Sequence, residues 1–187
     1  MKKLLLLILL LSFSFLGLAY AETRDSFLEG IKDVVELDFS DGSIYKGQVE
    51  ECFISNKQIT CFKGIGIYTF QTGYRYEGEF KDNKPNGQGV FTSPDGQYYK
   101  GGFKDGKLNG IGIMNYPDGR RFEGEYKDNK RDGYGIMTYQ NGGMFEESSR
   151  YEGDWKNDKR DGHGVMTYLD DGRRLEGEFK ENVFIGD

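Results

Sequence analysis

Few residues of this 187-residue chain have the type and spacing that catalysis requires. His163 is the only histidine, so a Ser-His-Asp or Cys-His site has a single base to draw on. It stands between two glycines, a place that is taken elsewhere in the chain by Gln88, Ile111 and Tyr134. This variation indicates a permissive position, and we expect no catalytic residue there.

Paired acids recur in the chain, and paired carboxylates can hydrolyse glycosides. Glu77 and Glu79 are two residues apart, as are Glu123 and Glu125. Because the pattern returns many times, a charged, solvated strand face explains it better than one active site. The sequence therefore predicts no enzyme.

Metal and cofactor motifs are equally weak. The segment 82–87 is rich in Asp and Asn, but Lys84 stands where a calcium loop needs an acid, and no closing Glu follows. The Gly-x-Gly pairs lack the third glycine and the helix of a dinucleotide site. We expect no metal and no cofactor, and only weak divalent binding at the turns stays open.

These residues belong to a repeat, whose clearest copy is residues 76–98, YEGEFKDNKPNGQGVFTSPDGQY. Further copies begin at Tyr99, Phe122 and Tyr151, an interrupted copy begins at Tyr45, and a truncated one begins at Leu175. Each unit of such an array buries its apolar side only against its neighbours. The chain thus divides into residues 1–21, residues 22–44 and a repeat domain over 45–187.

One repeat is predicted to be a hairpin followed by a return turn. Side chains alternate along a strand, so Tyr76, Gly78 and Phe80 share one face and Glu77 and Glu79 the other. The Lys-Asp-Asn-Lys-Pro-Asn-Gly segment has turn chemistry, and a second strand is expected from about residue 87 to 93. Asp-Gly pairs then provide the return, which gives a meander of about twelve strands.

The units resemble MORN repeats, whose hallmark is an aromatic-x-Gly opening followed by a Gly-x-Gly. The repeat glycines that carry this resemblance are Gly78, Gly87, Gly89, Gly101, Gly110, Gly112, Gly124, Gly133, Gly135, Gly153, Gly162 and Gly164. The resemblance implies an all-β fold, a single-layer twisted antiparallel sheet. It also implies a protein that binds or scaffolds and has no catalytic centre of its own.

Glycine inside a strand leaves room for a large neighbour to lie across the backbone. We therefore expect the opening aromatic and the fifth-position aromatic of each repeat to cover glycines of adjacent strands. The candidate binding face formed by this aromatic ladder comprises Tyr76, Phe80, Tyr99, Phe103, Phe122, Tyr126, Tyr151 and Trp155.

The N-terminus differs from the repeats. Two lysines, an apolar run over residues 4–18 and Ala19-Tyr20-Ala21 are typical of a cleaved secretory signal. The expected location is therefore secreted or periplasmic. In residues 26–36, apolar residues at helical spacing behind a Ser26/Glu29 capping box predict a short helix that covers the first edge of the sheet. A partner-binding helix, a further strand and disorder are the alternatives.

Cys52 and Cys61 lie in an insertion within the first repeat. In an exported chain an even cysteine pair predicts a disulfide. A second insertion, residues 145–150, lengthens a return turn before Tyr151.

The net charge of the chain narrows the classes of ligand that it can bind. The chain has 25 basic and 31 acidic residues, and cleavage after residue 21 removes two lysines and no acid, which changes the net charge from −6 to −8. This opposes nucleic acid as a ligand. We expect a protein partner at the aromatic face or a sheet edge, and an envelope glycan or lipid is the alternative.

The C-terminal repeat stops after its first strand, 175–179, so this strand is expected to have an unpaired edge. The apolar residues 183–185 are predicted either to fold back as a cap or to pair with a second molecule in a homodimer.

Overall fold

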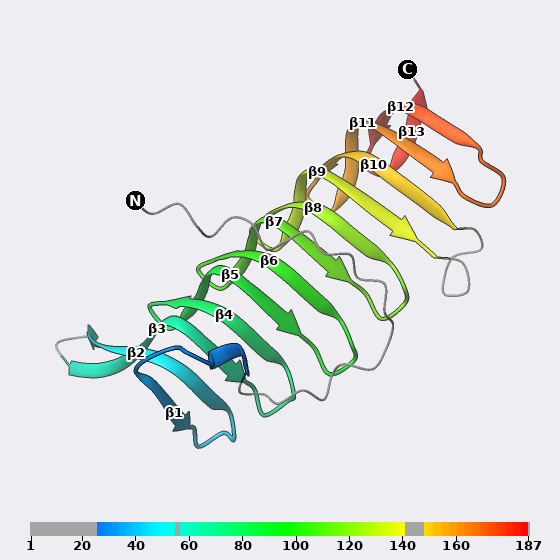
Figure 1. Ribbon diagram of the computed structural model, residues 1–187. Helices are drawn as coiled ribbons and strands as arrows, with labels where there is room; N and C mark the ends of the chain where they lie inside the picture. Colours follow the sequence, from blue (N-terminus) through cyan, green and yellow to red (C-terminus); the bar gives the residue numbers. More distant parts are fainter. Residues whose placement is uncertain (1–25, 55–56, 141–147, 187) are drawn as a thin grey trace, which may run out of the picture.

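The computed structural model describes residues 26–54, 57–140 and 148–186, which form one open antiparallel sheet of 13 strands in chain order. The predicted signal, residues 1–21, lies outside these residues. Figure 1 shows the hairpins side by side along an elongated, curled sheet, with β1 and β13 at opposite ends. The strands are β1 (Val34–Asp38), β2 (Ile44–Ile54), β3 (Lys57–Thr69), β4 (Arg75–Lys81), β5 (Lys84–Thr92), β6 (Tyr98–Lys104), β7 (Lys107–Asn115), β8 (Arg121–Lys127), β9 (Lys130–Tyr139), β10 (Ser149–Lys156), β11 (Lys159–Tyr168), β12 (Arg174–Lys180) and β13 (Val183–Gly186).

The cross-strand register aligns one glycine from every strand between β2 and β12 in a single row. Its members are Gly47, Gly66, Gly78, Gly89, Gly101, Gly112, Gly124, Gly135, Gly153, Gly164 and Gly177. A parallel row of large side chains lies two residues before the glycine on the first strand of each hairpin and two residues after it on the second strand. The row begins with Tyr45, Tyr68, Tyr76, Phe91 and Tyr99. The predicted meander and its 23-residue period are therefore confirmed.

The rings of the opening aromatics lie on the glycine row. A Cβ added to Gly89 would stand 2.5 Å from the Tyr76 hydroxyl, and one added to Gly78 would meet the same hydroxyl at 2.5 Å. Real Cβ atoms do not approach that closely, so the glycines are required by space. The core of the protein is this contact, repeated along the sheet.

A single layer has no second layer to cover its rings, yet the core rings are buried. Tyr45, Tyr99, Phe122 and Tyr151 are all 0% exposed. The sheet itself must therefore enclose them, and the strands in Figure 1 bend over in this way. We call the enclosed side the inner face and the opposite side the outer face.

The hairpins β4–β5, β6–β7, β8–β9, β10–β11 and β12–β13 each turn on two residues with positive φ, which is the backbone of a type I′ turn. In β4–β5 these are Asp82 (φ 50) and Asn83 (φ 65). The second strand therefore begins at Lys84, three residues before the expected start. The residues up to Gln88 form a bulge, where the register shifts between Gly78 and Phe80.

The predicted N-terminal helix is wrong. Only Ser26–Leu28 is helical, as one 3-10 turn, and Val34–Asp38 is the edge strand β1. Gly30 (φ 80) and Asp33 (φ 59) take left-handed backbone, which ends any helix between these two elements. No helix among residues 26–54, 57–140 and 148–186 is long and apolar enough to cross a membrane.

The predictions for the cysteines, the C-terminal strand and the second insertion have different outcomes. Cys52 and Cys61 form a disulfide between β2 and β3, as predicted. The last strand does have a returning partner, because residues 183–185 fold back as the cap alternative predicted: β13 pairs with β12, and Phe184 packs on Phe179. Half of the second insertion, residues 145–147, lies outside the described residues, and β10 begins at Ser149.

Candidate functional site

The eight aromatic residues predicted as a binding face are the centre of the core. Tyr76, Phe80, Tyr99, Phe103, Phe122, Tyr126, Tyr151 and Trp155 are between 0% and 7% exposed. In this structure a partner would meet the residues around these rings and not the rings themselves.

The two kinds of ring have different roles. The nearest side-chain atoms to the glycine row come from the opening aromatics. A fifth-position ring instead stands edge-on between two of them, as Phe103 does against Tyr76 (4.9 Å between centroids) and Tyr99 (5.2 Å). Each fifth-position ring thereby joins one repeat to the previous one.

The opening tyrosines also satisfy the backbone at the bulge. The hydroxyl of Tyr99 donates to the carbonyl oxygen of Gly102 (3.0 Å), and that of Tyr151 donates to the carbonyl of Asp154 (3.1 Å). Burial raises the pKa of Tyr99 and of Tyr151 to about 12. These phenols stay protonated near neutral pH and supply structure, not acid–base chemistry.

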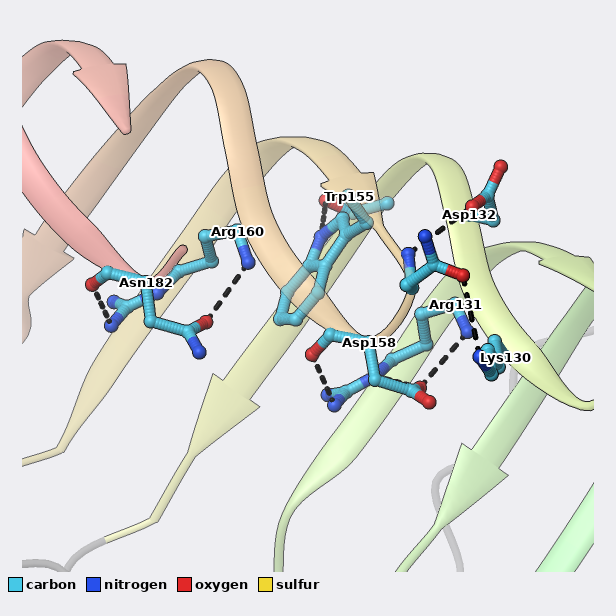
Figure 2. A network of polar contacts seen from close by, with 9 residues as sticks. Lys130, Arg131, Asp132, Trp155, Asp158, Arg160 and Asn182 are labelled. Carbon is cyan, nitrogen blue, oxygen red and sulfur yellow. Dashed lines mark hydrogen bonds and ion pairs between the residues drawn. The ribbon is translucent and has the colours of Figure 1, made fainter. Parts of the chain in front are cut away.

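Two arginines cover the later part of the aromatic row, where earlier repeats place Pro85 or Leu108. In Figure 2 the Arg131 guanidinium lies over the ring of Trp155, 4.4 Å from its centroid, and its Nε donates to Asp158 (3.1 Å). Arg160 repeats the arrangement, with its NH2 group donating to the carbonyl of Asn182 (2.8 Å).

One buried polar atom is unsatisfied. The Tyr126 hydroxyl has no hydrogen-bond partner among the described residues, whereas Nε1 of Trp155, at the same repeat position, donates to the Gly135 carbonyl (3.2 Å). Burial raises the pKa of Tyr126 well above its ordinary value. This phenol too remains protonated.

The outer face carries the charges. On β4, β8, β10 and β12 an arginine forms an ion pair with the glutamate two residues later: Arg75–Glu77, Arg121–Glu123, Arg150–Glu152 and Arg174–Glu176. The hydrogen bond from the Tyr134 hydroxyl (2.7 Å), together with Arg150, lowers the pKa of the Glu152 carboxyl. The expected charged, solvated face is this one.

A second row of outer-face acids has a role that sequence reasoning missed. Glu79 Oε1 accepts a hydrogen bond from the backbone N–H of Gln88 (2.7 Å), which lies at the bulge. Glu125 does the same for Tyr134 (3.1 Å), and Gln48 for Ile65 (3.0 Å). The signal was an acceptor at the fourth position opposite a Gly-x-Gly, which also holds for Asp154 and the N–H of His163 (3.1 Å). The repeat that begins at Tyr99 is the exception, because it has Gly102 at that position.

Large apolar side chains interrupt the outer face on β7 and β9. Ile111 is 74% exposed and Tyr134 is 50% exposed. Ile113 and Ile136 lie beside them one row away and are half-buried. We call these four residues the β7–β9 patch.

His163 is the one histidine of the chain that could serve as a base or a metal ligand. His163 is exposed, and its Nδ1 lies 3.6 Å from a Glu178 oxygen. No group of three or more His, Cys, Asp or Glu in residues 26–54, 57–140 and 148–186 could hold a metal ion.

Comparison with known families matches the MORN repeat to residues 76–98, 99–120, 122–144 and 151–173. The chain is a MORN-repeat protein. The resemblance inferred from the repeat glycines is thereby confirmed.

No curated protein matches the chain. One similar solved structure is the SAS-4 (dCPAP) TCP domain of Drosophila melanogaster, in complex with a proline-rich motif of Ana2 (dSTIL). It is 11% identical over 80% of this chain and 92% of that chain, with a TM-score of 0.39. Another, the G-box domain of the microcephaly protein CPAP, is 18% identical over 79% of this chain and 99% of that chain, with a TM-score of 0.21. TM-scores this low do not establish a shared fold.

Proposed function

We propose that this chain is a non-catalytic module that binds a protein partner on its outer face, after export through a cleaved N-terminal signal. The observation that carries the proposal is the β7–β9 patch. Large apolar side chains exposed within a polar surface are typical of a protein interface, whose centre is apolar and whose rim is polar. Tyr134 with its hydroxyl held by Glu152 is a rigid anchor of this kind.

The surroundings of the patch suit such an interface. Glu123 and Glu125 stand on β8 between the apolar residues of β7 and β9, and Lys100 lies opposite Ile113. The two carboxylates run through the middle of the patch and Lys100 lies at its side, so these charges can fix the register of a partner. The sheet beneath is held by the buried aromatic row, so the patch is presented on a rigid support.

The other candidate surfaces have less support. The alternative of a glycan or lipid ligand relied on the aromatic face, and those rings are enclosed by the sheet. The edges at β1 and β13 are outermost in the strand order, and a homodimer through the C-terminal edge stays a prediction.

Affinity capture tests the proposal. The mature chain and the Ile111→Ser/Tyr134→Ser double variant are used to capture proteins from the native envelope fraction, and the captured proteins are quantified by mass spectrometry. Loss of one protein from the double variant is expected. Leu169→Ser is the matched control, because Leu169 is 53% exposed and lies on a return turn away from the patch. Equal capture by all three forms would contradict the proposal.

A further inference from the structure

The hairpin turns carry a repeated pair of like charges. The last residue of the first strand and the first residue of the second strand are both lysine and lie directly opposite each other in four consecutive hairpins. These pairs are Lys81 with Lys84, Lys104 with Lys107, Lys127 with Lys130, and Lys156 with Lys159. All eight are exposed. We call them the lysine row.

Like charges directly opposite on a sheet are destabilising. Within the lysine row, Lys107 forms an ion pair with Asp128 (3.0 Å) and Lys159 with Glu181 (3.2 Å). The other members make no ion pair with any described residue; they are Lys81, Lys84, Lys104, Lys127, Lys130 and Lys156. Asp128 attracts Lys104 and Lys127, and Asp161 attracts Lys156. Each of the four turns nevertheless holds two lysines and one aspartate, which leaves an excess positive charge at every turn of a chain whose net charge is −6. A repeated arrangement that costs stability indicates a use.

Hydrogen bonds between repeats hold the turns in line. The turn residue Asn129 donates its backbone N–H to the Leu108 carbonyl (3.0 Å), and its Oδ1 accepts from the Leu108 N–H (2.7 Å). Asp158 makes the same two contacts with Arg131, at 2.9 Å and 3.0 Å. Each lysine pair is therefore fixed two strands from the next, a spacing of about 9.4–9.8 Å.

This spacing selects among anionic ligands. A polyproline II segment has three residues per turn and rises 3.1 Å per residue, so a carboxylate at every third residue recurs each ~9.3 Å. Each turn also holds one aspartate between its two lysines, as Asp82, Asp105 and Asp128 do, so the excess is one positive charge per turn. One ligand carboxylate per turn matches this excess, whereas a densely charged polyanion brings several negative charges to each turn.

We propose that the lysine row binds an extended acidic polypeptide segment with a carboxylate at every third residue. This deepens the proposed function, on which it rests, by naming the chemistry of one part of the partner. Because the contacts are between exposed charges, binding weakens as salt rises.

Peptide binding tests the proposal on the whole mature chain. A labelled (Glu-Pro-Pro)5 peptide is compared by fluorescence anisotropy with a peptide of the same composition whose five glutamates are contiguous. The periodic peptide is expected to bind at least about fivefold more tightly, and Lys104→Gln/Lys127→Gln to weaken it by about fivefold. Lys32→Gln/Lys63→Gln removes the same charge at two exposed lysines outside the row and is the control; circular dichroism verifies that both variants stay folded.

Three results would overturn the proposal: equal affinity for the two peptides, equal weakening by the two double variants, or tighter binding of polyphosphate or of anionic phosphatidylglycerol vesicles than of the periodic peptide. Partner capture separates this proposal from the proposed function. Capture that depends on Ile111 and Tyr134 while the periodic peptide fails to bind would overturn the lysine row alone.

Discussion

Tyr76 lies across Gly89 on the neighbouring strand, so closely that a Cβ on the glycine would come within 2.5 Å of the phenol oxygen and 2.6 Å of two ring carbons. The backbone of Gly89 does not have positive φ, so only space requires glycine there. The same relationship recurs at Gly112, Gly135 and Gly164 under the rings of Tyr99, Phe122 and Tyr151. It is the unit from which the array is built.

Gly89→Ala is therefore expected to destabilise the protein by about 1–3 kcal/mol, because the ring must move out of a close-packed row. Urea unfolding followed by circular dichroism measures the change. Gly96→Asn is the control, since Gly96 has φ 92 and a Cβ added there would meet no atom within 4 Å beyond its chain neighbours. Asparagine takes left-handed backbone with less strain than most residues, so a smaller loss is expected at Gly96. A loss there equal to that at Gly89 would contradict the steric explanation.

The sequence was sufficient to predict the sheet because period and alternation are local properties. The spacing of Tyr76, Gly78 and Phe80 defines a face, and the glycines opposite define a register. The curl that buries the aromatic face is a property of the whole sheet, so the same reasoning assigned buried rings to a binding surface.

The helix predicted for the N-terminal segment was wrong for a different reason. Leu28, Ile31 and Val35 fit a helical period, but a stretch this short also accommodates a turn and a strand. Pairing of Val34 with Gln48 on β2 decides the outcome, and that contact is invisible to a local pattern. The predicted hairpin turns were too long, because the bulge at the start of the second strand interrupts the alternation of side chains over three strand residues.

Trp155→Ala is expected to cost about 3–5 kcal/mol. Its ring is 4% exposed, stands edge-on to Phe122 and Tyr151, and lies under the Arg131 guanidinium. Trp155→Phe keeps the ring contacts and loses the hydrogen bond to Gly135, so a smaller loss is expected in the same denaturant titration. If both variants unfold at the same urea concentration, the ring contacts are not the source of the stability.

Glu79→Ala is expected to cost about 0.5–1.5 kcal/mol, because the N–H of Gln88 loses its acceptor at the bulge. Glu79→Gln should be close to neutral, since Gln48 already accepts the equivalent bond from Ile65 in the first repeat. Thermal unfolding of the two variants checks this. A glutamine variant as unstable as the alanine variant would show that the charge, not the acceptor, matters.

The turn contacts between repeats can be tested by a double-mutant cycle. One turn of the chain already lacks both groups of this contact: Gly106 has no side-chain acceptor, and its partner Pro85 has no N–H to donate. Asn129→Gly removes the acceptor for Leu108 and should cost about 1 kcal/mol. Combined with Leu108→Pro, the same substitution should cost less than it does alone, which unfolding free energies of the four forms will reveal. Strict additivity would argue against the contact.

The buried phenols make stability sensitive to alkali. Burial raises the pKa of Tyr99 and Tyr151 to about 12, while an unfolded tyrosine ionises near its ordinary pKa of about 10. The stabilising contribution is therefore complete below pH ~10 and is lost as pH rises from there towards the folded pKa, because the unfolded chain releases protons that the folded chain retains. The urea midpoint should be level between about pH 7 and 9 and fall steeply above pH ~10, with phenolate absorbance appearing as the sheet signal disappears. Tyr99→Phe/Tyr151→Phe, which copies the phenylalanine that the chain already has at Phe122, should show a shallower decline; ionisation of these tyrosines near pH ~10 with the sheet intact would contradict their burial.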